Sequence, residues 1–373
     1  MLDNLYTKLT AKVNYKLLML LPIILSLLLL GVISFKGIPM SIDFVGGTRI
    51  ELSLNESLSQ EKLYNLKDVL HSMDLKNLKI HVSEDILANV YKLEITTTSI
   101  INESDIKPLL ERHLGKELQS LDVIKIYLPE NTSLSSDFLE TLKKVTVADI
   151  KLDKERNLVT IKGIDLEEEK IKRIFEYRLG FTPRIDVNKK NFRMQTIGPS
   201  LGEKFREQGF WALIFAYILI VVVVFLIFRD FVPSIAIILA ATCDAIAAFG
   251  GMSLFDIVLE PASLVSILML IGYSVDTDIL LTTRVLRGER GTINERIDNA
   301  MKTGLTMTTT TIVVMVTVIV LTNFLGVPVL SSIATVLLIG LLMDILTTWL
   351  MNAGLLKMYL EEMKGKPKSG VKK

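Results

Sequence analysis

The sequence is poor in the residues on which most enzymes and disulfide-stabilised proteins depend. Its 373 residues include one cysteine, Cys243, and three histidines, His71, His81 and His113. A single cysteine excludes any disulfide within the chain. The histidines lack the close spacing of a zinc site, so we interpret them as ordinary surface or strand residues. The sequence has no phosphate-binding GxxxxGK[ST] motif, no HExxH motif and no Ser/His/Asp arrangement, and we therefore expect neither an enzyme nor a metal protein.

The sequence also lacks an excess of either charge, because its net charge is +1. Charge therefore gives no indication of a nucleic-acid partner. What the chain has instead is apolar residues: they make up 50% of it, and the mean hydropathy is +0.44. These values exceed the ordinary range of soluble proteins and predict a membrane protein with a sizeable polar portion.

Six apolar runs are long enough to cross a bilayer, which takes about 20 residues per helix. They are Leu17–Phe35, Phe210–Phe228, Pro233–Leu254, Ala262–Thr283, Leu305–Thr322 and Val329–Leu350. The first run follows three lysines and could be mistaken for a signal peptide. Because no small-x-small cleavage site follows it, we interpret it as a retained span.

Positive charge gathers in four segments that six crossings would place on one side. These are the head with Lys8, Lys12 and Lys16, the turn at Arg229, the loop with Arg284, Arg287, Arg290, Arg296 and Lys302, and the tail with Lys357, Lys364, Lys366, Lys368, Lys372 and Lys373. The connections on the other side, Phe255–Pro261 and Asn323–Pro328, carry no Lys or Arg. The positive-inside rule therefore predicts a multi-pass protein of the cell membrane with both termini in the cytoplasm.

We expect four parts: residues 1–37 (head and first span), 38–205 (an extracytoplasmic domain), 206–356 (the other five spans) and 357–373 (a basic cytoplasmic tail). Within the outer domain, strand-like alternation occurs at Arg49–Leu54, Asn77–Ser83, Val90–Thr97 and Leu121–Leu128, and helical periodicity at Leu58–Met73 and Glu103–Leu114. This β-α-β-β-α-β order predicts a ferredoxin-like α+β fold that ends with Leu121–Leu128. A second, smaller group follows, with helices Ser135–Ala148 and Leu166–Leu179 and strands Leu158–Ile164, Arg184–Asn188 and Phe192–Ile197.

Aspartates occur inside three spans: Asp244 in the third, Asp276 and Asp278 in the fourth, and Asp344 in the sixth. Asp244 lies at the middle of its run, and Asp276 and Asp344 lie roughly 6–7 Å to the cytoplasmic side of theirs. An ionisable side chain at this depth costs at least about 2.5–3.5 kcal/mol, which makes it a functional-site hypothesis. Asp276 and Asp278 point about 160–200° apart on a helix. We expect one of them to face an ion path and the other a neighbouring helix or subunit.

These acids leave three interpretations open. A carboxyl group that exchanges protons with water from either side could carry H⁺. Together with the nearby threonines (Thr282, Thr283, Thr306, Thr308, Thr309, Thr310, Thr311, Thr347 and Thr348) the acids could instead coordinate Na⁺, a hard cation that favours oxygen ligands. The plainer interpretation is that the polar groups only hydrogen-bond the helices to one another.

Glycines mark both junctions between the first two spans and the outer domain. Asp43-Phe44-Val45-Gly46-Gly47-Thr48 follows the first span, and Ile197-Gly198-Pro199-Ser200-Leu201-Gly202 leads back to the second. On spacing alone the favoured interpretation of the first motif is a simple linker into a strand. Glycine content makes both junctions hinge candidates, and Leu201–Gln208 is expected to start a helix that runs into the membrane.

Two motifs and the layout of the spans resemble the SecD/SecF family. The segment Asp43–Thr48 is similar to the DFxGGT signature after the first span of SecF and SecD. The segment Ile271-Gly272-Tyr273-Ser274-Val275 is similar to the GYS signature in the fourth span of SecF. Six spans with one large domain between the first two match SecF along essentially the whole chain. The resemblance implies an RND-type fold, in which six-helix bundles carry ferredoxin-like outer domains.

The fourth span departs from the bacterial pattern at the acidic motif. Bacterial SecF continues Asn-Asp after GYSV, whereas this chain continues Asp276-Thr277-Asp278. The family's acidic position therefore falls on Thr277, and Asp276 or Asp278 is expected to take its role. Arg284 matches the arginine that follows the acidic motif in the family. The variant looks more like archaeal SecF.

The resemblance implies a subunit that pairs with SecD, assists the SecYEG translocon, and pulls or releases unfolded secretory polypeptides outside the membrane. An ion gradient, H⁺ (the proton motive force) or Na⁺, would supply the energy, and no other cofactor is expected. Two rivals stay open. An RND-type exporter of small molecules or lipids usually has two bundles in one chain, whereas this chain has one. A non-transporting membrane scaffold would keep its function when the span acids are neutralised.

Overall fold

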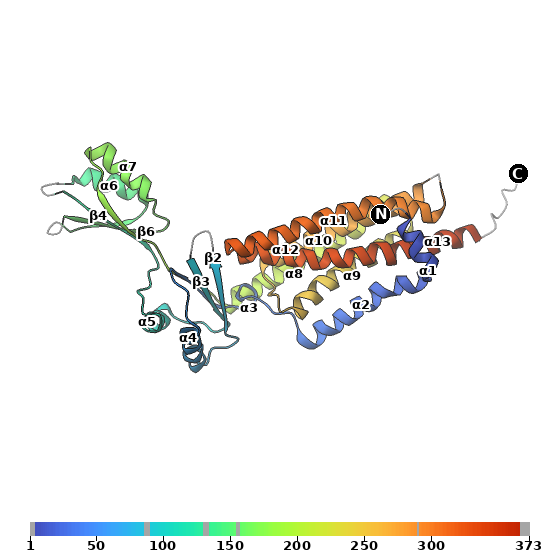
Figure 1. The fold of residues 1–373 in the computed structure, drawn as a ribbon, viewed down its shortest axis with the longest axis horizontal. Helices are drawn as coiled ribbons and strands as arrows, with labels where there is room; N and C mark the ends of the chain where they lie inside the picture. The colour runs from blue at the N-terminus through green and yellow to red at the C-terminus, as the bar shows by residue number, and fades with distance from the viewer. Residues whose placement is uncertain (1–3, 86–89, 130–133, 154–156, 289–290, 366–373) are drawn as a thin grey trace. The chain divides into compact units, whose positions relative to one another are not determined.

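The computed structural model describes residues 4–85, 90–129, 134–153, 157–288 and 291–365. Arg290, Lys366, Lys368, Lys372 and Lys373, which belong to the predicted basic loop and tail, lie outside these residues. The chain forms two compact units, one of Met1–Val45 with Pro199–Lys373 and one of Gly46–Gly198 (Figure 1). We call them the helical unit and the outer unit.

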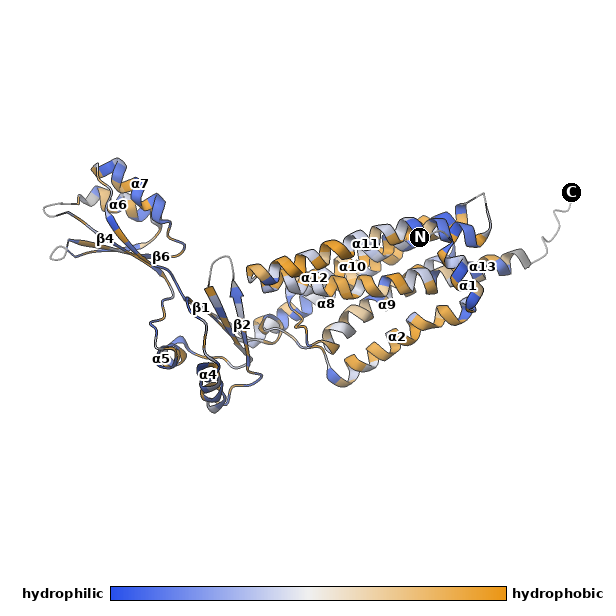
Figure 2. Ribbon diagram, viewed as in Figure 1, coloured by the Kyte–Doolittle hydropathy of each residue, from blue (hydrophilic) through white to orange (hydrophobic). Residues whose placement is uncertain are grey.

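The helical unit contains six helices long and apolar enough to cross a membrane, as the hydropathy pattern predicted (Figure 2). They are α2 (Tyr15–Lys36), α8 (Pro199–Phe228), α9 (Phe231–Leu254), α10 (Pro261–Arg287), α11 (Ile293–Leu325) and α12 (Pro328–Leu346), which continues through a π-helix, η1 (Thr347–Asn352), into α13 (Ala353–Gly365). Two short helices accompany them, α1 (Leu5–Lys12) and α3 (Ile42–Val45). The predicted helix from Leu201 is the start of α8, which begins at Pro199.

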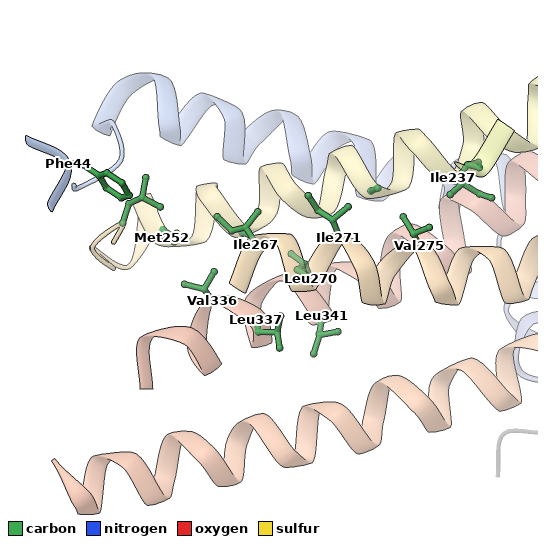
Figure 3. Close-up of a cluster of buried hydrophobic side chains, with 14 of the residues drawn as sticks. Phe44, Ile237, Met252, Ile267, Leu270, Ile271, Val275, Val336, Leu337 and Leu341 are labelled. Carbon is green, nitrogen blue, oxygen red and sulfur yellow. The ribbon is translucent and has the colours of Figure 1, made fainter. Parts of the chain in front are cut away.

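Helices α9, α10 and α12 form the centre of the helical unit. Within the most apolar stretches, 56% of α9 and 50% of α10 are buried in the protein, against 6% of α8 and 11% of α2. Ile237 of α9, Ile271 of α10 and Leu337 of α12 belong to the central apolar cluster (Figure 3). The outer surfaces of α2, α8 and α11 are apolar and exposed in the isolated chain, as expected of faces that contact lipid or other membrane helices.

Local sequence signals set the starts of α10 and α11. Helix α10 begins with Pro261 at its first position and with a reciprocal pair of bonds between Glu260 and Ser263. Helix α11 begins with the same capping box, formed by Thr292 and Glu295. Such boxes satisfy backbone N–H groups that have no partner within the helix.

The tightest close approach between helices α11 and η1 involves a glycine. A Cβ atom on Gly304 would lie 2.3 Å from Cζ2 of Trp349, whose ring is 1% exposed. We expect Gly304→Ala to lower the free energy of unfolding by about 1–3 kcal/mol, because the buried ring must shift. Thermal unfolding in detergent, followed by tryptophan fluorescence, measures the change.

Gly272→Ala in α10 is the matched control for this prediction. A Cβ atom at Gly272 meets no atom within 4 Å, and both substitutions gain the same helix propensity, up to about 1 kcal/mol. Equal melting temperatures for the two variants would mean that the contact between Gly304 and Trp349 is not tight.

The described residues of the outer unit form eight strands and four helices. In chain order they are β1 (Gly47–Leu54), α4 (Gln60–Ser72), β2 (Lys79–Asp85), β3 (Val90–Thr97), α5 (Glu103–Leu114), β4 (Asp122–Tyr127), α6 (Ser136–Thr146), β5 (Asp149–Asp153), β6 (Leu158–Gly163), α7 (Glu168–Leu179), β7 (Arg184–Asn188) and β8 (Phe192–Ile197). They form two antiparallel sheets with the strand orders β2-β3-β1-β8 and β5-β6-β4-β7.

Each sheet with its two helices has the ferredoxin-like order β-α-β-β-α-β, and the second is inserted into the first. The first subdomain is β1-α4-β2-β3-α5-β8, and the second, β4-α6-β5-β6-α7-β7, lies in the chain between α5 and β8. The prediction that Leu121–Leu128 ends the first fold was wrong, because β4 pairs with β6 and β7. Strand β8 closes the first sheet beside β1, with Gly47 opposite Ile197. Strand β5, which the pattern missed, completes the second sheet.

A single asparagine ties the two ends of the inserted subdomain together. Asn191 accepts a hydrogen bond at its side-chain oxygen from the backbone N–H of Gln119 (2.6 Å) and donates its own N–H to the Gln119 carbonyl (3.0 Å). Its carbonyl accepts from Ser53 of β1 (2.9 Å). The insertion therefore enters and leaves the first subdomain through paired backbone segments.

The DFVGGT motif does more than link the first span to a strand. Phe44 in α3 is 3% exposed and packs in the central apolar cluster of the helical unit. Gly46 and Gly47 have φ angles of 80° and 140°, values that disfavour any residue with a Cβ atom. Thr48 is buried in the outer unit, where its hydroxyl donates to the Ser99 carbonyl (3.0 Å). Asp43 lies in α3. The glycines are thus required by backbone conformation, and a hinge role for them stays a prediction.

Candidate functional site

Three carboxyl side chains from different helices converge in the centre of the helical unit. Asp244 comes from α9, Asp278 from α10 and Asp344 from α12, and each is 0% exposed. These are the three helices that form the unit's core. Hydroxyl and amide groups link the carboxyls into what we call the aspartate network.

Asp244 is held by hydroxyls from two other helices. Its Oδ2 accepts a hydrogen bond from Ser274 Oγ of α10 at 2.5 Å, and its Oδ1 accepts one from Thr347 Oγ1 of η1 at 2.8 Å. Ser274 belongs to the GYS motif. The motif serine therefore positions the acid of the third span.

Thr348 bridges the other two carboxyls. Its Oγ1 lies 2.9 Å from Asp278 Oδ1 and 3.1 Å from Asp344 Oδ1. Asn352 Nδ2 donates to the same oxygen of Asp278 at 2.7 Å. Asp278 and Asp344 are thereby joined through one hydroxyl group.

The π-helix η1 provides the polar groups that face the acids. Its residues Thr347, Thr348 and Asn352 are all fully buried. Thr347 contacts Asp244, whereas the next residue in the chain contacts Asp278 and Asp344. Helical segments with i→i+5 hydrogen bonds are rare and occur frequently at functional sites.

The bonding of Thr348 has a chemical consequence. A hydroxyl carries one hydrogen, so Thr348 can donate fully to one carboxylate at a time, and its oxygen can accept from a donor on the other side. A proton held by Asp278 or Asp344 would complete both short contacts. Two ionised carboxylates around the same hydroxyl would instead repel each other in a medium of low dielectric constant.

Several oxygens of the aspartate network have no protein partner among the described residues. These are Asp278 Oδ2, Asp344 Oδ2 and Asn352 Oδ1, all of them enclosed. No described Lys, Arg or His forms an ion pair with the three aspartates. Buried charge without a partner is costly, so a proton or a bound cation would relieve a real energetic cost here. In the described parts of the chain, no group of three His, Cys, Asp or Glu side chains has the arrangement of a metal site.

Three of the residues predicted to take part in ion coupling lie outside the network. Asp276 is exposed on the surface of the isolated helical unit. Thr277 is 4% exposed, but its hydroxyl bonds to the Tyr273 carbonyl of its own helix (3.1 Å). Arg284 donates to α11, where its Nη1 lies 2.8 Å from the Asn299 carbonyl. Of the two acids of the motif, Asp278 is the one that meets the other carboxyls.

Asp276 shares its face of α10 with the rest of the GYS motif. Gly272 and Asp276 are one helical turn apart, and Tyr273, 43% exposed, lies beside them. This polar face, made of Gly272, Tyr273 and Asp276, points away from the aspartate network, which Ser274 and Asp278 face. The fourth span therefore carries two polar faces with different surroundings.

The predicted threonines divide between the network, the surface and other buried positions, the last being Thr282 and Thr308. Thr347 and Thr348 bond to the acids, whereas the hydroxyls of Thr306, Thr310 and Thr311 on α11 bond to their own backbone. Asn352 was missed by the sequence reasoning. A detectable signal was present, since Asp344, Thr348 and Asn352 follow at intervals of four residues, which places them along one helix face.

Comparison with family models identifies two regions of the chain. Residues 181–362 match the model described as "Protein export membrane protein SecD/SecF, C-terminal". Residues 31–57, which contain the DFVGGT motif, match the "SecD/SecF GG Motif". The first of these regions includes all three aspartates of the network.

The chain is also similar to individual proteins. It is 36% identical over 360 residues to the protein-export membrane protein SecF of Methanocaldococcus jannaschii, a match that covers 95% of this chain and 98% of that protein. It is 58% identical over 169 residues to SecF of Methanothermobacter thermautotrophicus, where 45% of this chain and 59% of the relative are covered.

Among solved structures, the crystal structure of SecDF from Thermus has a similar fold. The TM-score is 0.57 at 17% identity, and the match covers 93% of this chain and 38% of the SecDF chain. With a SecF relative aligned over almost its full length, both motifs and six long apolar helices in place, the chain belongs to the SecF proteins of the SecD/SecF family of protein-export membrane proteins.

Proposed function

We propose that this chain couples an ion gradient, H⁺ or Na⁺, to protein export, and that it acts with SecD and the SecYEG translocon on unfolded secretory polypeptides. The bridge that Thr348 makes between Asp278 and Asp344 carries the proposal. Helix α10 contributes one acid of this pair and α12 the other. A proton or cation that binds between them changes the interaction of two core helices, which is the kind of local change that a transport cycle needs.

The single-hydrogen argument at Thr348 supports H⁺ over Na⁺ as the coupling ion. The unpartnered oxygens of Asp278 and Asp344 keep Na⁺ open, since oxygen ligands suit a hard cation. A non-transporting scaffold needs no such network, because hydrogen bonds between neutral side chains hold membrane helices together equally well. The three carboxyl groups are therefore the feature that favours an ion-coupled export subunit over a non-transporting scaffold.

The polar face of Gly272, Tyr273 and Asp276 supports a membrane partner. A carboxyl group exposed to lipid near the middle of a bilayer costs at least about 2.5–3.5 kcal/mol, so a second set of membrane helices is expected to cover Asp276. The match to SecDF covers 38% of that chain, so the SecDF protein of similar fold is longer than this chain. This difference in length is consistent with SecD as the second set of membrane helices. Cysteine crosslinking from a Tyr273→Cys variant to SecD would test whether SecD covers this face. Crosslinks to SecD only from cysteines on the outer face of α2 would contradict it.

A gradient experiment tests the function as a whole. Membrane vesicles that contain this chain, SecD and SecYEG are given a proton gradient or a Na⁺ gradient, and export of a trapped precursor is measured. We expect one gradient to raise export by at least about tenfold, which corresponds to 1.4 kcal/mol, and the matching ionophore to abolish the gain. Equal export with and without either gradient would contradict ion coupling and favour a non-transporting scaffold. The proposed topology, with both termini in the cytoplasm, is checked in the same vesicles by labelling of the termini.

A further inference from the structure

The inserted subdomain carries a groove that neither the aspartate network nor the family motifs explain. Helices α6 and α7 pack side by side on the second sheet, where Phe138 and Phe175 meet edge to face at 5.0 Å between ring centroids. Between the outward sides of these helices lies an open groove of about 450 Å³. We call it the α6–α7 groove and define it by Val145, Lys170, Arg173, Ile174, Tyr177 and Arg178.

The apolar part of the groove is unusually exposed. Tyr177 is 89% exposed and Val145 is 40% exposed, although each belongs to a helix whose opposite side is buried in the core. Lone exposed apolar residues are ordinary, but here Val145, Ile174 and Tyr177 line the same groove. Clustered apolar surface of this kind marks interaction sites more often than scattered residues do.

The end of α6 adds a strained position beside this surface. Val147, two residues after Val145, has a φ angle of 50° and is 88% exposed. A β-branched residue in the left-handed region is a genuine outlier, because its side chain crowds the backbone. Glycine or asparagine would fit this C-cap better, so the chain keeps an exposed apolar side chain here against its conformational preference.

The charged part of the groove is mostly basic. Lys170, Arg173 and Arg178 lie one to two turns apart on α7, and none of them forms an ion pair with another described residue. The lining acids, Glu167 and Glu169, lie at the first turn of α7, where acidic side chains stabilise the helix start. By contrast, Lys172 on another side of the same helix pairs with Glu168 at 2.5 Å. The groove therefore presents cations that have no ion-pair partner among the described residues, next to the apolar side chains that line it.

We infer that the α6–α7 groove binds a segment of unfolded polypeptide in which acidic and apolar residues alternate. The inference rests on the proposed function, which brings unfolded secretory chains to the outer domain. Arg173 and Arg178 would pair with carboxylates by charge-assisted bonds, and Tyr177 would stack on an apolar side chain at little entropic cost. The groove is open to solvent, which suits a passing chain better than an enclosed small molecule.

The test uses the full-length protein in detergent, with no ion gradient, and a fluorescein-labelled flexible peptide of Leu, Glu, Ser and Gly. Fluorescence anisotropy measures binding. We expect saturable binding that Tyr177→Ser weakens by about tenfold and that Arg173→Glu combined with Arg178→Glu abolishes, since each close charge pair contributes on the scale of hot-spot residues. Tyr64→Ser is the matched control, because Tyr64 is a 66% exposed tyrosine on α4 of the first subdomain.

Three results would overturn the inference. One is equal affinity for a peptide in which Lys replaces Glu. Another is a Tyr177→Ser variant that binds as the unchanged protein does. The third is binding of vesicles with anionic lipid in place of peptide, which would make the groove a membrane contact.

This test is separate from that of the proposed function. Asp278→Asn is expected to leave peptide binding unchanged, because it lies in the other unit. Normal peptide binding with no gradient-dependent export would contradict ion coupling and support peptide binding by the α6–α7 groove. Gradient-dependent export with no peptide binding would contradict the inference that the α6–α7 groove binds peptide and would support ion coupling.

Discussion

Asp278→Asn is expected to reduce gradient-driven export to the level measured without a gradient, a loss of at least about tenfold, or 1.4 kcal/mol. Asparagine keeps the shape of the side chain and can still accept at its oxygen from Thr348 and Asn352, so the helices stay in contact. It cannot take up or release a proton, and it contributes no negative charge to hold a cation. Export of a secreted reporter in cells, with the amount of assembled protein checked, measures the effect.

Asp276→Asn is the matched control, because it makes the same chemical change two residues away in the same helix. Asp276 is exposed in the isolated helical unit and lies outside the aspartate network, whose hydrogen bonds involve Asp244, Asp278 and Asp344. We expect it to alter association with the partner and to leave coupling in the assembled complex largely intact. If Asp276→Asn abolishes export and Asp278→Asn does not, the coupling acid lies at the partner face. If the double variant secretes normally, the aspartate network serves packing alone.

The six spans were predictable because they depend on local sequence. An apolar run of about 20 residues can only be a span or a buried helix, whereas the sides of the membrane assigned to the loops from Lys and Arg stay a prediction. Asp244 and Asp344 fall at comparable positions in their runs, and the structure brings them together. The DFVGGT and GYS motifs predicted the family, which the comparison with archaeal SecF confirms.

The nested outer unit was not predictable from the order of elements alone. Two successive β-α-β-β-α-β patterns read the same whether the second fold follows the first or interrupts it. What decides is the pairing of β8 with β1, two strands about 140 residues apart in the chain, which depends on long-range backbone bonds. The pattern therefore assigned Leu121–Leu128 to the wrong sheet.

The choice between Asp276 and Asp278 also lay beyond local sequence. Helical periodicity places the two acids on opposite faces but does not say which face meets α9 and α12. The π-helix η1 is a second such feature, since none of the sequence patterns predicts i→i+5 hydrogen bonds at Thr347–Asn352.

Thr348→Val carries the second large expected effect, because it removes the bridging hydroxyl and nearly conserves the volume. Of the two oxygens that face Thr348, one would lose its donor and the other its hydrogen-bond partner in a fully buried site, a cost of about 1–3 kcal/mol. If the hydroxyl passes a proton between the two acids, we expect gradient-driven export to fall by roughly tenfold or more, the equivalent of 1.4 kcal/mol. The vesicle assay described above measures it.

Thr348→Ser separates that role from packing, since serine restores the hydroxyl without the methyl group. Recovery of export in Thr348→Ser together with its loss in Thr348→Val would assign the effect to the hydroxyl. Thr347→Val gives a comparison in the adjacent residue, whose hydroxyl bonds to the carboxyl group of Asp244 and reaches Asp344 only at its backbone carbonyl. If Thr347→Val and Thr348→Val impair export equally while Thr348→Ser restores nothing, the π-helix supports the core by its shape, and the path of the ion does not run through the Asp278–Thr348–Asp344 bridge.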